Sequence, residues 1–281
     1  MLKLYSIILL LLFGCSTTSM EFASAKSAAR TEKNLVRGEE WGLKALNTPS
    51  DSNNALVPYF LATEIYKPQE KWGKMAEMLN EAEKRNPDQK LDQKDWFLTV
   101  SDEEYKKMLT DNKIEAVVNT IKKGVKAYRE EAWTMIFNQA IELINANEDI
   151  EGLEKLNLCL KMDASHPETY NALVGYYAEK GDLKIARDYV QQGLDINQSA
   201  ALYEINAKLL LSEFQNSGNQ NSLEEAEKMY LKAMTLVAGD TEILLGLKKQ
   251  LIFVYIDMNE NQQAIDISNE LLNIYYDDPD L

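Results

Sequence analysis

The sequence predicts an all-α fold in which pairs of antiparallel helices stack into a solenoid, and three observations support this. The 281 residues include only 12 glycines and 6 prolines, few for a protein built from short strands and tight turns. Apolar residues recur at the three- and four-residue spacing of amphipathic helices along most of the chain. Paired helical patterns also return after about 34 residues, a period typical of helical repeat proteins.

Residues 1–14 have the pattern of an export signal. Lys3 gives the start a positive charge, residues 7–13 are apolar throughout, and the small Gly14 precedes Cys15. An apolar run of seven residues is too short to cross a bilayer as a helix. We therefore expect residues 1–14 to be a signal peptide that is cleaved from the mature protein.

Leu12, Phe13, Gly14 and Cys15 together resemble the lipobox of bacterial lipoproteins. This resemblance implies a diacylglycerol on the thiol of Cys15, cleavage before that residue, and acylation of the new amino group. Phe13 departs from the pattern, because the residue at its position is usually smaller. The alternative is an ordinary secreted protein that is cleaved among residues 16–23.

Ser16 bears on which membrane would retain the protein. Serine in place of aspartate at this position resembles the default sorting of Gram-negative lipoproteins to the outer membrane. The small and polar residues that follow Cys15 suit a short flexible tether, which we expect over residues 15–21. The expected location is the cell envelope, with a lipid anchor in the outer membrane and the folded part facing the periplasm.

Residues 167–200 show the repeat most clearly. Tyr170, Leu173 and Tyr177 would share one face of a first helix, and Gly181 would form the turn that follows. Ala186 would lie in the second helix, where the two helices approach closely. The spacing therefore predicts a helix-turn-helix unit.

This segment resembles a tetratricopeptide repeat, whose signature places a large residue, Leu and Tyr in the first helix and small residues in the second. Val174 and Gly193 depart from that signature, which usually has Gly and Ala at their positions. The resemblance implies helix pairs stacked into a right-handed superhelix.

The same pattern recurs on both sides of this segment. Gly152 stands 34 residues before Ala186, at the equivalent position. After an insertion that we interpret as a polar loop at residues 215–222, the later equivalents are Ala226, Tyr230, Ala233 and Ala264. Upstream, helices are predicted within residues 39–46, 72–84 and 113–128.

We therefore expect residues 22–281 to form one continuous array of about six to seven helix pairs. Residues 91–100 fit the pattern least well. They are interpreted either as an irregular connection or as a surface that binds something.

Composition and residue types argue against several function classes. The formal charge of −15, with no basic stripe, argues against nucleic acid as a partner. The single histidine, His166, is expected in an exposed turn, and one histidine cannot build a zinc site made of several His and Cys. No glycine-rich phosphate loop or nucleophile motif is present. We predict a protein that is not an enzyme, with no catalytic residue, metal or cofactor.

In tetratricopeptide proteins the first helix of each pair lines a concave groove. By this resemblance the possible groove residues here are Phe137, Ile141, Ile144, Asn171, Ile205 and Leu209. Their apolar character favours an apolar or helical peptide as ligand. The alternative is that these side chains pack against neighbouring helices.

The leading hypothesis is a non-catalytic scaffold or adaptor that holds other envelope proteins or peptides. One alternative is a component of the outer-membrane β-barrel or pilus assembly machinery. A glycan-cleaving enzyme of helical-solenoid shape is an alternative of another class. A third class is a self-assembling array that associates through the end carrying Tyr275 and Tyr276.

Overall fold

The computed structural model describes residues 18–95, 97–98, 117–237 and 239–277. The expected signal peptide, Cys15 and the first part of the expected tether lie outside these residues, as do the side chains of Tyr275 and Tyr276. The described chain is all-α apart from one short β-ladder, which confirms the predicted fold class. Within it, no helix has the length and apolarity needed to span a bilayer.

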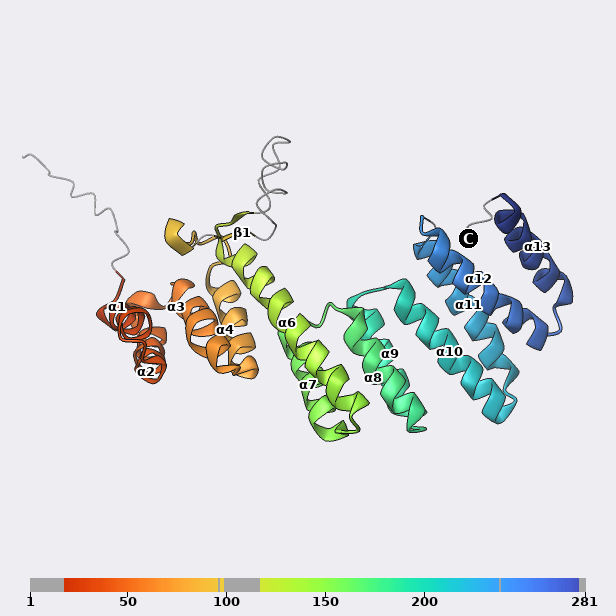
Figure 1. Ribbon diagram of the computed structural model, residues 1–281, viewed down its shortest axis with the longest axis horizontal. Helices are drawn as coiled ribbons and strands as arrows, with labels where there is room; N and C mark the ends of the chain where they lie inside the picture. The colour runs from red at the N-terminus through yellow and green to blue at the C-terminus, as the bar shows by residue number, and fades with distance from the viewer. Residues whose placement is uncertain (1–17, 96, 99–116, 238, 278–281) are drawn as a thin grey trace, which may run out of the picture. The chain divides into compact units, whose positions relative to one another are not determined.

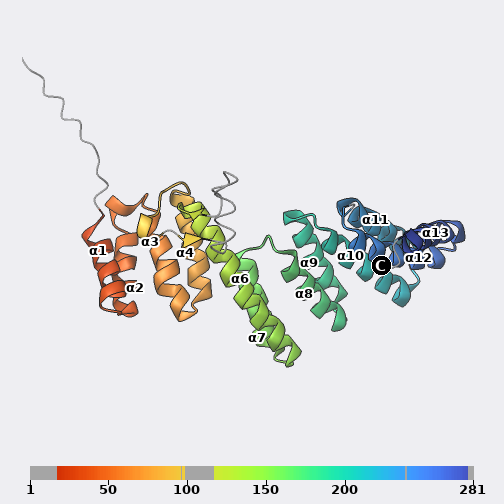
Figure 2. The same cartoon turned by 45° about the horizontal axis from the view of Figure 1, so that its top comes forward.

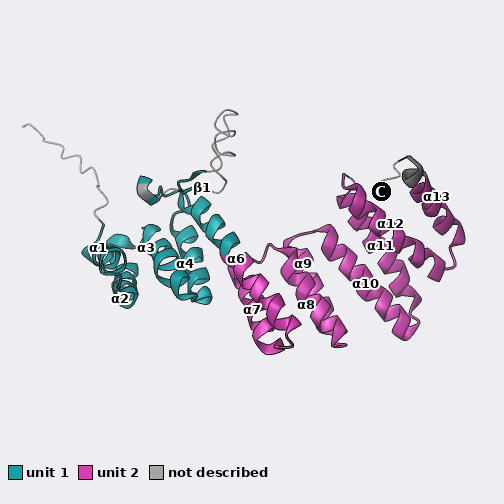
Figure 3. Ribbon diagram, in the orientation of Figure 1, with its two compact units in different colours: residues 1–131 teal, residues 132–281 magenta. Residues whose placement is uncertain are grey.

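Two compact units make up the chain, residues 1–131 and 132–281, where one continuous array was expected (Figure 3). The boundary falls inside helix α6 (Ile121–Asn145), so the first half of this helix belongs to unit 1 and the second half to unit 2.

The described residues of unit 1 form two helix pairs and an irregular connection (Figure 1). In the first pair α1 (Met20–Lys26) runs into the π-helix η1 (Ser27–Thr31) and packs on α2 (Leu35–Leu46). In the second, α3 (Leu56–Phe60) runs into the π-helix η3 (Leu61–Tyr66) and packs on α4 (Trp72–Arg85). Three short 3₁₀ turns are η2 (Pro49–Asp51), η4 (Lys67–Gln69) and η5 (Gln93–Asp95).

Helix α1 begins earlier than the expected tether allows. The hydroxyl of Ser19 accepts a hydrogen bond from the backbone N–H of Phe22 at 3.0 Å and so caps the helix. Ser19 and Phe22 are both buried. The last residues of the stretch 15–21 are therefore part of the fold, because Ser19 is the cap and Met20 and Glu21 are helical.

The helix predicted over residues 113–128 is wrong in its first part. Val117 and Val118 form strand β2 (Val117–Val118), which pairs antiparallel with β1 (Phe97–Leu98), and α6 begins only at Ile121. Both valines are buried, so their apolar character reflects the ladder rather than a helix face. Residues 113–116 lie outside the described residues.

Unit 2 consists of antiparallel helix pairs, which lie side by side in both views (Figures 1 and 2). After the second half of α6 come α7 (Asp149–Met162), α8 (Pro167–Glu179), α9 (Leu183–Ile196), α10 (Ala200–Ser217), α11 (Gln220–Leu236), α12 (Thr241–Asp257) and α13 (Asn261–Asp277). With α6 and α7 counted as a pair, the described residues hold six pairs.

The polar loop expected at residues 215–222 is almost absent. Helix α10 continues to Ser217 and α11 starts at Gln220, so the turn is Gly218 and Asn219. Gly218 has a φ of 70°, which glycine adopts without strain. The insertion therefore lengthens both helices, since a backbone inside a helix satisfies its own hydrogen bonds.

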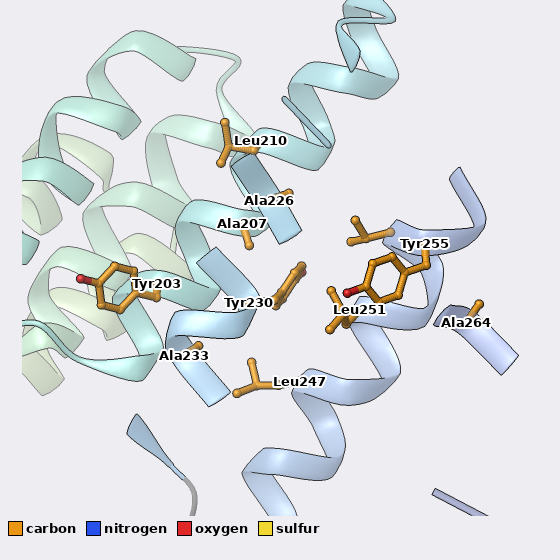
Figure 4. Packing of buried hydrophobic residues seen from close by; sticks show 11 residues of the cluster. Tyr203, Ala207, Leu210, Ala226, Tyr230, Ala233, Leu247, Leu251, Tyr255 and Ala264 are labelled. Carbon is orange, nitrogen blue, oxygen red and sulfur yellow. The ribbon is translucent and has the colours of Figure 1, made fainter. Parts of the chain in front are cut away.

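Small residues allow the helices of unit 2 to approach closely. Figure 4 shows Tyr230 of α11 among Ala207 of α10 and Leu247 and Leu251 of α12. Ala226, Ala233 and Ala264 complete the small positions of this buried cluster. Packing around one large tyrosine ring thus joins two successive helix pairs.

Gly193 of α9 explains one departure from the tetratricopeptide signature. A Cβ atom there would lie 2.9 Å from Cγ of Tyr170 and 2.9 Å from Cδ1 of Leu202. Alanine, usual at this position, therefore does not fit between these two side chains. Gly175 of α8 differs, because an added Cβ would have no neighbour within 4 Å.

These two glycines give a matched pair of substitutions. We expect Gly193→Ala to lower the free energy of unfolding by about 1–2 kcal/mol, because overpacking outweighs the gain in helix propensity. Gly175→Ala is expected to raise it by roughly 0.5–1 kcal/mol. Urea unfolding followed by circular dichroism measures both, and equal stability of the two variants would contradict the close packing at Gly193.

Candidate functional site

The candidate site is a pocket of about 370 Å³ in unit 1. It lies between the first helices of both pairs in this unit, the first half of α6 and the irregular connection. The lining residues are Phe22, Lys26, Arg30, Leu56, Tyr59, Phe60, Thr63, Glu64, Leu91, Asp92, Asp95, Phe97 and Tyr128. We call this the aromatic pocket.

Helical spacing explains why two segments supply most of the wall. Phe22, Lys26 and Arg30 follow one another at four-residue intervals along α1 and η1. On α3 and η3 the lining positions are 56, 59, 60, 63 and 64, again one helix face. Each segment therefore turns a single face toward the pocket.

Five aromatic rings form the apolar part of the pocket. Phe22 packs edge-on against Phe60, with ring centroids 5.6 Å apart. Tyr128 of α6 packs edge-on against both Tyr59 at 5.9 Å and Phe97 at 5.6 Å. Such T-shaped pairs hold each ring in a preferred geometry. The wall is therefore pre-formed and apolar.

Gly124 allows Tyr59 to lie directly against α6. A Cβ atom at Gly124 would be 2.7 Å from Cζ and 2.8 Å from Cε2 of the Tyr59 ring. Burial raises the pKa of the Tyr59 and Tyr128 phenols, with nearby acidic groups adding to the effect. Both phenols are therefore neutral at physiological pH and act as apolar walls with a polar edge.

Arg30 carries the main electrostatic contacts of the pocket. Its guanidinium donates to both carboxylate oxygens of Glu64, at 2.8 and 2.5 Å, and to Asp95 at 3.4 Å. The hydrogen bond to Glu64 is the largest influence on its pKa, which is raised although desolvation opposes the rise. Because Asp95 belongs to the irregular connection, Arg30 ties that connection to both helix pairs of the unit.

Lys26 differs from Arg30 in the groups that its side chain contacts. Its ammonium lies 4.6 Å from the centroid of the Phe22 ring, a cation–π contact. Among the residues that the structure describes, no carboxylate lies within 4.0 Å of it. The pocket thus holds one neutralised cation and one without a counter-charge. Elsewhere in the described chain, no three His, Cys, Asp or Glu side chains are grouped to hold a metal ion.

The residues of the predicted repeat signature lie in helix packing. Gly181 forms the turn between α8 and α9 with a φ of 82°, and Tyr177 is half-buried and stacks on Tyr189 at 5.7 Å. The other signature residues are buried: Tyr170, Leu173, Ala186, Gly152, Ala226, Tyr230, Ala233 and Ala264. A Cβ added at Gly152 would lie 2.6 Å from Cγ1 of Ile144, so that helix crossing is tighter than alanine allows.

The residues predicted to line a groove are mostly packing residues as well. Leu209 is only 5% exposed and belongs to a buried cluster with Val174 and Ala186, against which Ile205 also packs. Phe137 and Ile144 pack against a second cluster around Leu156. Ile141 and Asn171 are half-buried. These side chains therefore pack against neighbouring helices and do not line an open groove, as the alternative interpretation stated. This applies to Leu209, Ile205, Phe137 and Ile144.

His166 is in the predicted turn, but its expected exposure is wrong. Its ring stacks on that of Trp133 with centroids 3.8 Å apart, and 17% of the side chain is exposed. The indole N–H of Trp133 donates to the buried hydroxyl of Thr169 at 2.9 Å. The histidine is therefore part of the aromatic packing between α6 and the start of α8.

The aromatic pocket was not predicted as such, since its wall comes from four segments distant in sequence. The one available signal was the poor fit of residues 91–100, for which a binding surface was one of two interpretations. Phe97 from that stretch does line the pocket. The side chains of Trp96 and Leu98 lie outside the described residues.

This protein resembles known proteins in structure but not detectably in sequence. No protein-family model and no curated protein matches the sequence. Among solved structures, a tetratricopeptide repeat protein from Parabacteroides merdae is 15% identical with a TM-score of 0.37, covering 91% of this chain and 80% of its own. PilW, a type IV pilus biogenesis factor, is 16% identical with a TM-score of 0.35 over 89% and 90% of the two chains.

YrrB, a tetratricopeptide protein with an unusual peptide-binding site, is 14% identical with a TM-score of 0.33, over 83% of this chain and 93% of its own. TM-scores below 0.5 at such identities carry no argument about function. The fold itself rests on the helix pairs with their small residues at the crossings.

Proposed function

We propose that this protein is a non-catalytic scaffold, anchored by a lipid on Cys15 to the outer membrane of a bacterium, that holds other envelope proteins. The aromatic pocket of unit 1 is its docking site for a segment of a partner protein. The observation that carries this proposal is the pocket itself. Five aromatic rings line it in a pre-formed arrangement, and the first helices of two successive pairs supply most of its wall.

The chemistry of the pocket favours binding over catalysis. Arg30 occupies both oxygens of Glu64 and contacts Asp95, so these carboxylates are engaged in holding the connection in place. The third lining carboxylate, Asp92, also has a contact within the protein. A glycan-cleaving site needs one carboxylic acid and one carboxylate free to act on the substrate. The tyrosines are neutral and largely apolar. The pocket combines these rings with charged side chains, and concave sites that combine apolar walls with placed polar groups are typical of ligand binding.

The lipid anchor is supported by the sequence around Cys15 and by the start of the fold. Because α1 is capped by Ser19, only a few residues separate Cys15 from folded structure. The aromatic pocket includes Phe22 of this same helix. A lipid at Cys15 would thus keep the docking site close to the membrane surface, where envelope proteins are assembled.

Site-specific photo-crosslinking tests the docking site. We expect a benzophenone amino acid in place of Phe97 to crosslink one partner protein in living cells, through a single segment identified by mass spectrometry. The same probe in place of Phe253, an exposed aromatic residue of α12, is the control. Phe253 lies in unit 2 and lines no part of the pocket.

A second substitution links the crosslink to the pocket. Thr63 is half-buried on the pocket wall, and Thr63→Trp is expected to fill the space and lower the Phe97 crosslink about tenfold. The folded state is checked by circular dichroism. Crosslinking at Phe97 that is no stronger than at Phe253, or that is unchanged by Thr63→Trp, would contradict the proposed site.

A further inference from the structure

The two cations of the aromatic pocket differ in a way that bears on its ligand. Arg30 is neutralised within the protein by Glu64 and Asp95. Lys26, four residues earlier on the same helix face, forms no ion pair with any described residue and only contacts the Phe22 ring. Lys26 is therefore the lining cation left to pair with a ligand, whereas the lining carboxylates of Glu64, Asp92 and Asp95 already have contacts within the protein.

The surroundings of Lys26 strengthen this charge. Its ammonium is held 4.6 Å from the centroid of the buried Phe22 ring, which itself packs on Phe60. A charge beside apolar side chains is less screened than one in open water. A carboxylate brought to this position by a ligand would therefore form a charge-assisted contact stronger than that of a fully exposed pair.

The apolar part of the pocket lies next to this charge. The rings of Tyr59, Phe60 and Tyr128 line the same pocket as Lys26. Aromatic walls favour an aromatic or large aliphatic side chain, which can pack edge-on against them. A ligand that satisfies both features carries a large apolar group and a negative charge close together.

We propose that the aromatic pocket binds a segment of a partner protein that carries an aromatic or large aliphatic side chain close in sequence to an aspartate or glutamate. The apolar side chain packs against Tyr59, Phe60 and Tyr128, and the carboxylate pairs with Lys26. This inference rests on the proposed function and adds the chemistry of the partner segment to it.

A basic partner segment is disfavoured by the same contacts. To pair with Glu64 or Asp95, a lysine or arginine of the partner would have to displace Arg30, which makes two hydrogen bonds to Glu64. The third lining carboxylate, Asp92, also has a contact of its own already. It would also enter beside the uncompensated charge of Lys26. The protein as a whole is acidic, with a net charge of −15, so the acidic preference proposed here is local to the pocket.

Peptide selection tests the charge preference without a known partner. The full chain in detergent, immobilised on beads, is presented with a phage library of random linear peptides, and the bound sequences are counted against those bound by Thr63→Trp. We expect at least about tenfold enrichment of peptides that combine an aromatic or large aliphatic residue with Asp or Glu.

Charge reversal supplies the decisive comparison. When the Lys26→Glu variant is immobilised instead, we expect the enriched peptides to keep their apolar residue and to contain Lys and Arg in place of Asp and Glu. The matched control is Lys122→Glu, an exposed lysine of α6 that does not line the pocket, and the acidic preference is expected to persist on it. Circular dichroism verifies that both variants are folded.

The outcomes separate the two levels of the proposal. The role of Lys26 is overturned if the pocket enriches apolar peptides without an acidic preference. It is also overturned if Lys26→Glu enriches Asp and Glu as the wild type does. Either outcome leaves the docking site standing. No enrichment over Thr63→Trp overturns the docking site and, with it, this inference. Acidic enrichment that reverses on Lys26→Glu and not on Lys122→Glu supports both.

Discussion

Replacing Cys15 by alanine is expected to abolish acylation and the mature form that begins at residue 15. The wild-type chain should be recovered from membranes with an intact mass that matches a triacylated protein starting at Cys15, and this species should be absent from Cys15→Ala. Each buried methylene contributes about 0.8 kcal/mol to membrane binding, so several acyl chains anchor stably where one does not. Intact-mass spectrometry and labelling with an acyl analogue measure the change.

The matched control is the other cysteine. Cys159 is buried in α7, and burial raises the pKa of its thiol to about 12, so it is a poor nucleophile. We expect Cys159→Ala to retain the acyl label in full. A wild-type product without acyl chains, cleaved further downstream, would contradict the anchor and make the protein a secreted one.

The structure also limits where such a downstream cleavage can occur. Residues 16–23 are the range for the alternative signal site, yet Ser19 caps α1 and Phe22 is buried against Phe60. Cleavage after residue 22 would remove a ring from the aromatic pocket. The alternative is thus compatible with an intact fold only if cleavage falls before Ser19.

The helix pairs of unit 2 were the most predictable part of the fold. Their helices depend on local spacing of apolar residues, which the sequence displays directly. Small residues such as Ala186 and Ala226 mark the crossings, because a large side chain there would separate the helices. Gly193 shows the limit of that logic, since the need for glycine comes from Tyr170 and Leu202 on two other helices.

The errors arose where contacts are long-range. Two adjacent valines, Val117 and Val118, do not distinguish a strand from a helix by spacing alone, and their partners are 19 to 21 residues away. His166 was expected to be exposed because it lies in a Ser-His-Pro turn between helix pairs, and the ring that covers it, Trp133, is on α6. The aromatic pocket failed to appear in the sequence for the same reason.

Tyr230 offers the largest expected effect on stability. Its side chain is fully buried between two helix pairs of unit 2, in the cluster of Figure 4. We expect Tyr230→Ala to lower the free energy of unfolding by about 3–5 kcal/mol, because it leaves a cavity that the backbone of three helices cannot close. Urea unfolding monitored by circular dichroism measures this loss.

The hydroxyl of the same tyrosine should contribute nothing to stability. Its oxygen is buried and has no hydrogen-bond partner among the described residues, and burial raises the pKa of Tyr230, so the phenol stays neutral. Tyr230→Phe keeps the ring and removes a buried polar group, and we expect a change between zero and about 1 kcal/mol in favour of the folded state.

Tyr255 provides the contrasting case in the same cluster. Its hydroxyl donates a hydrogen bond to the carboxylate of Glu227 at 2.8 Å, so Tyr255→Phe should destabilise the fold by about 1 kcal/mol. The two substitutions remove the same atom, and only Tyr255→Phe is expected to lower the free energy of unfolding. Equal losses from both would mean that Tyr230 has a hydrogen-bond partner, and the packing of α11 between α10 and α12 would have to be revised.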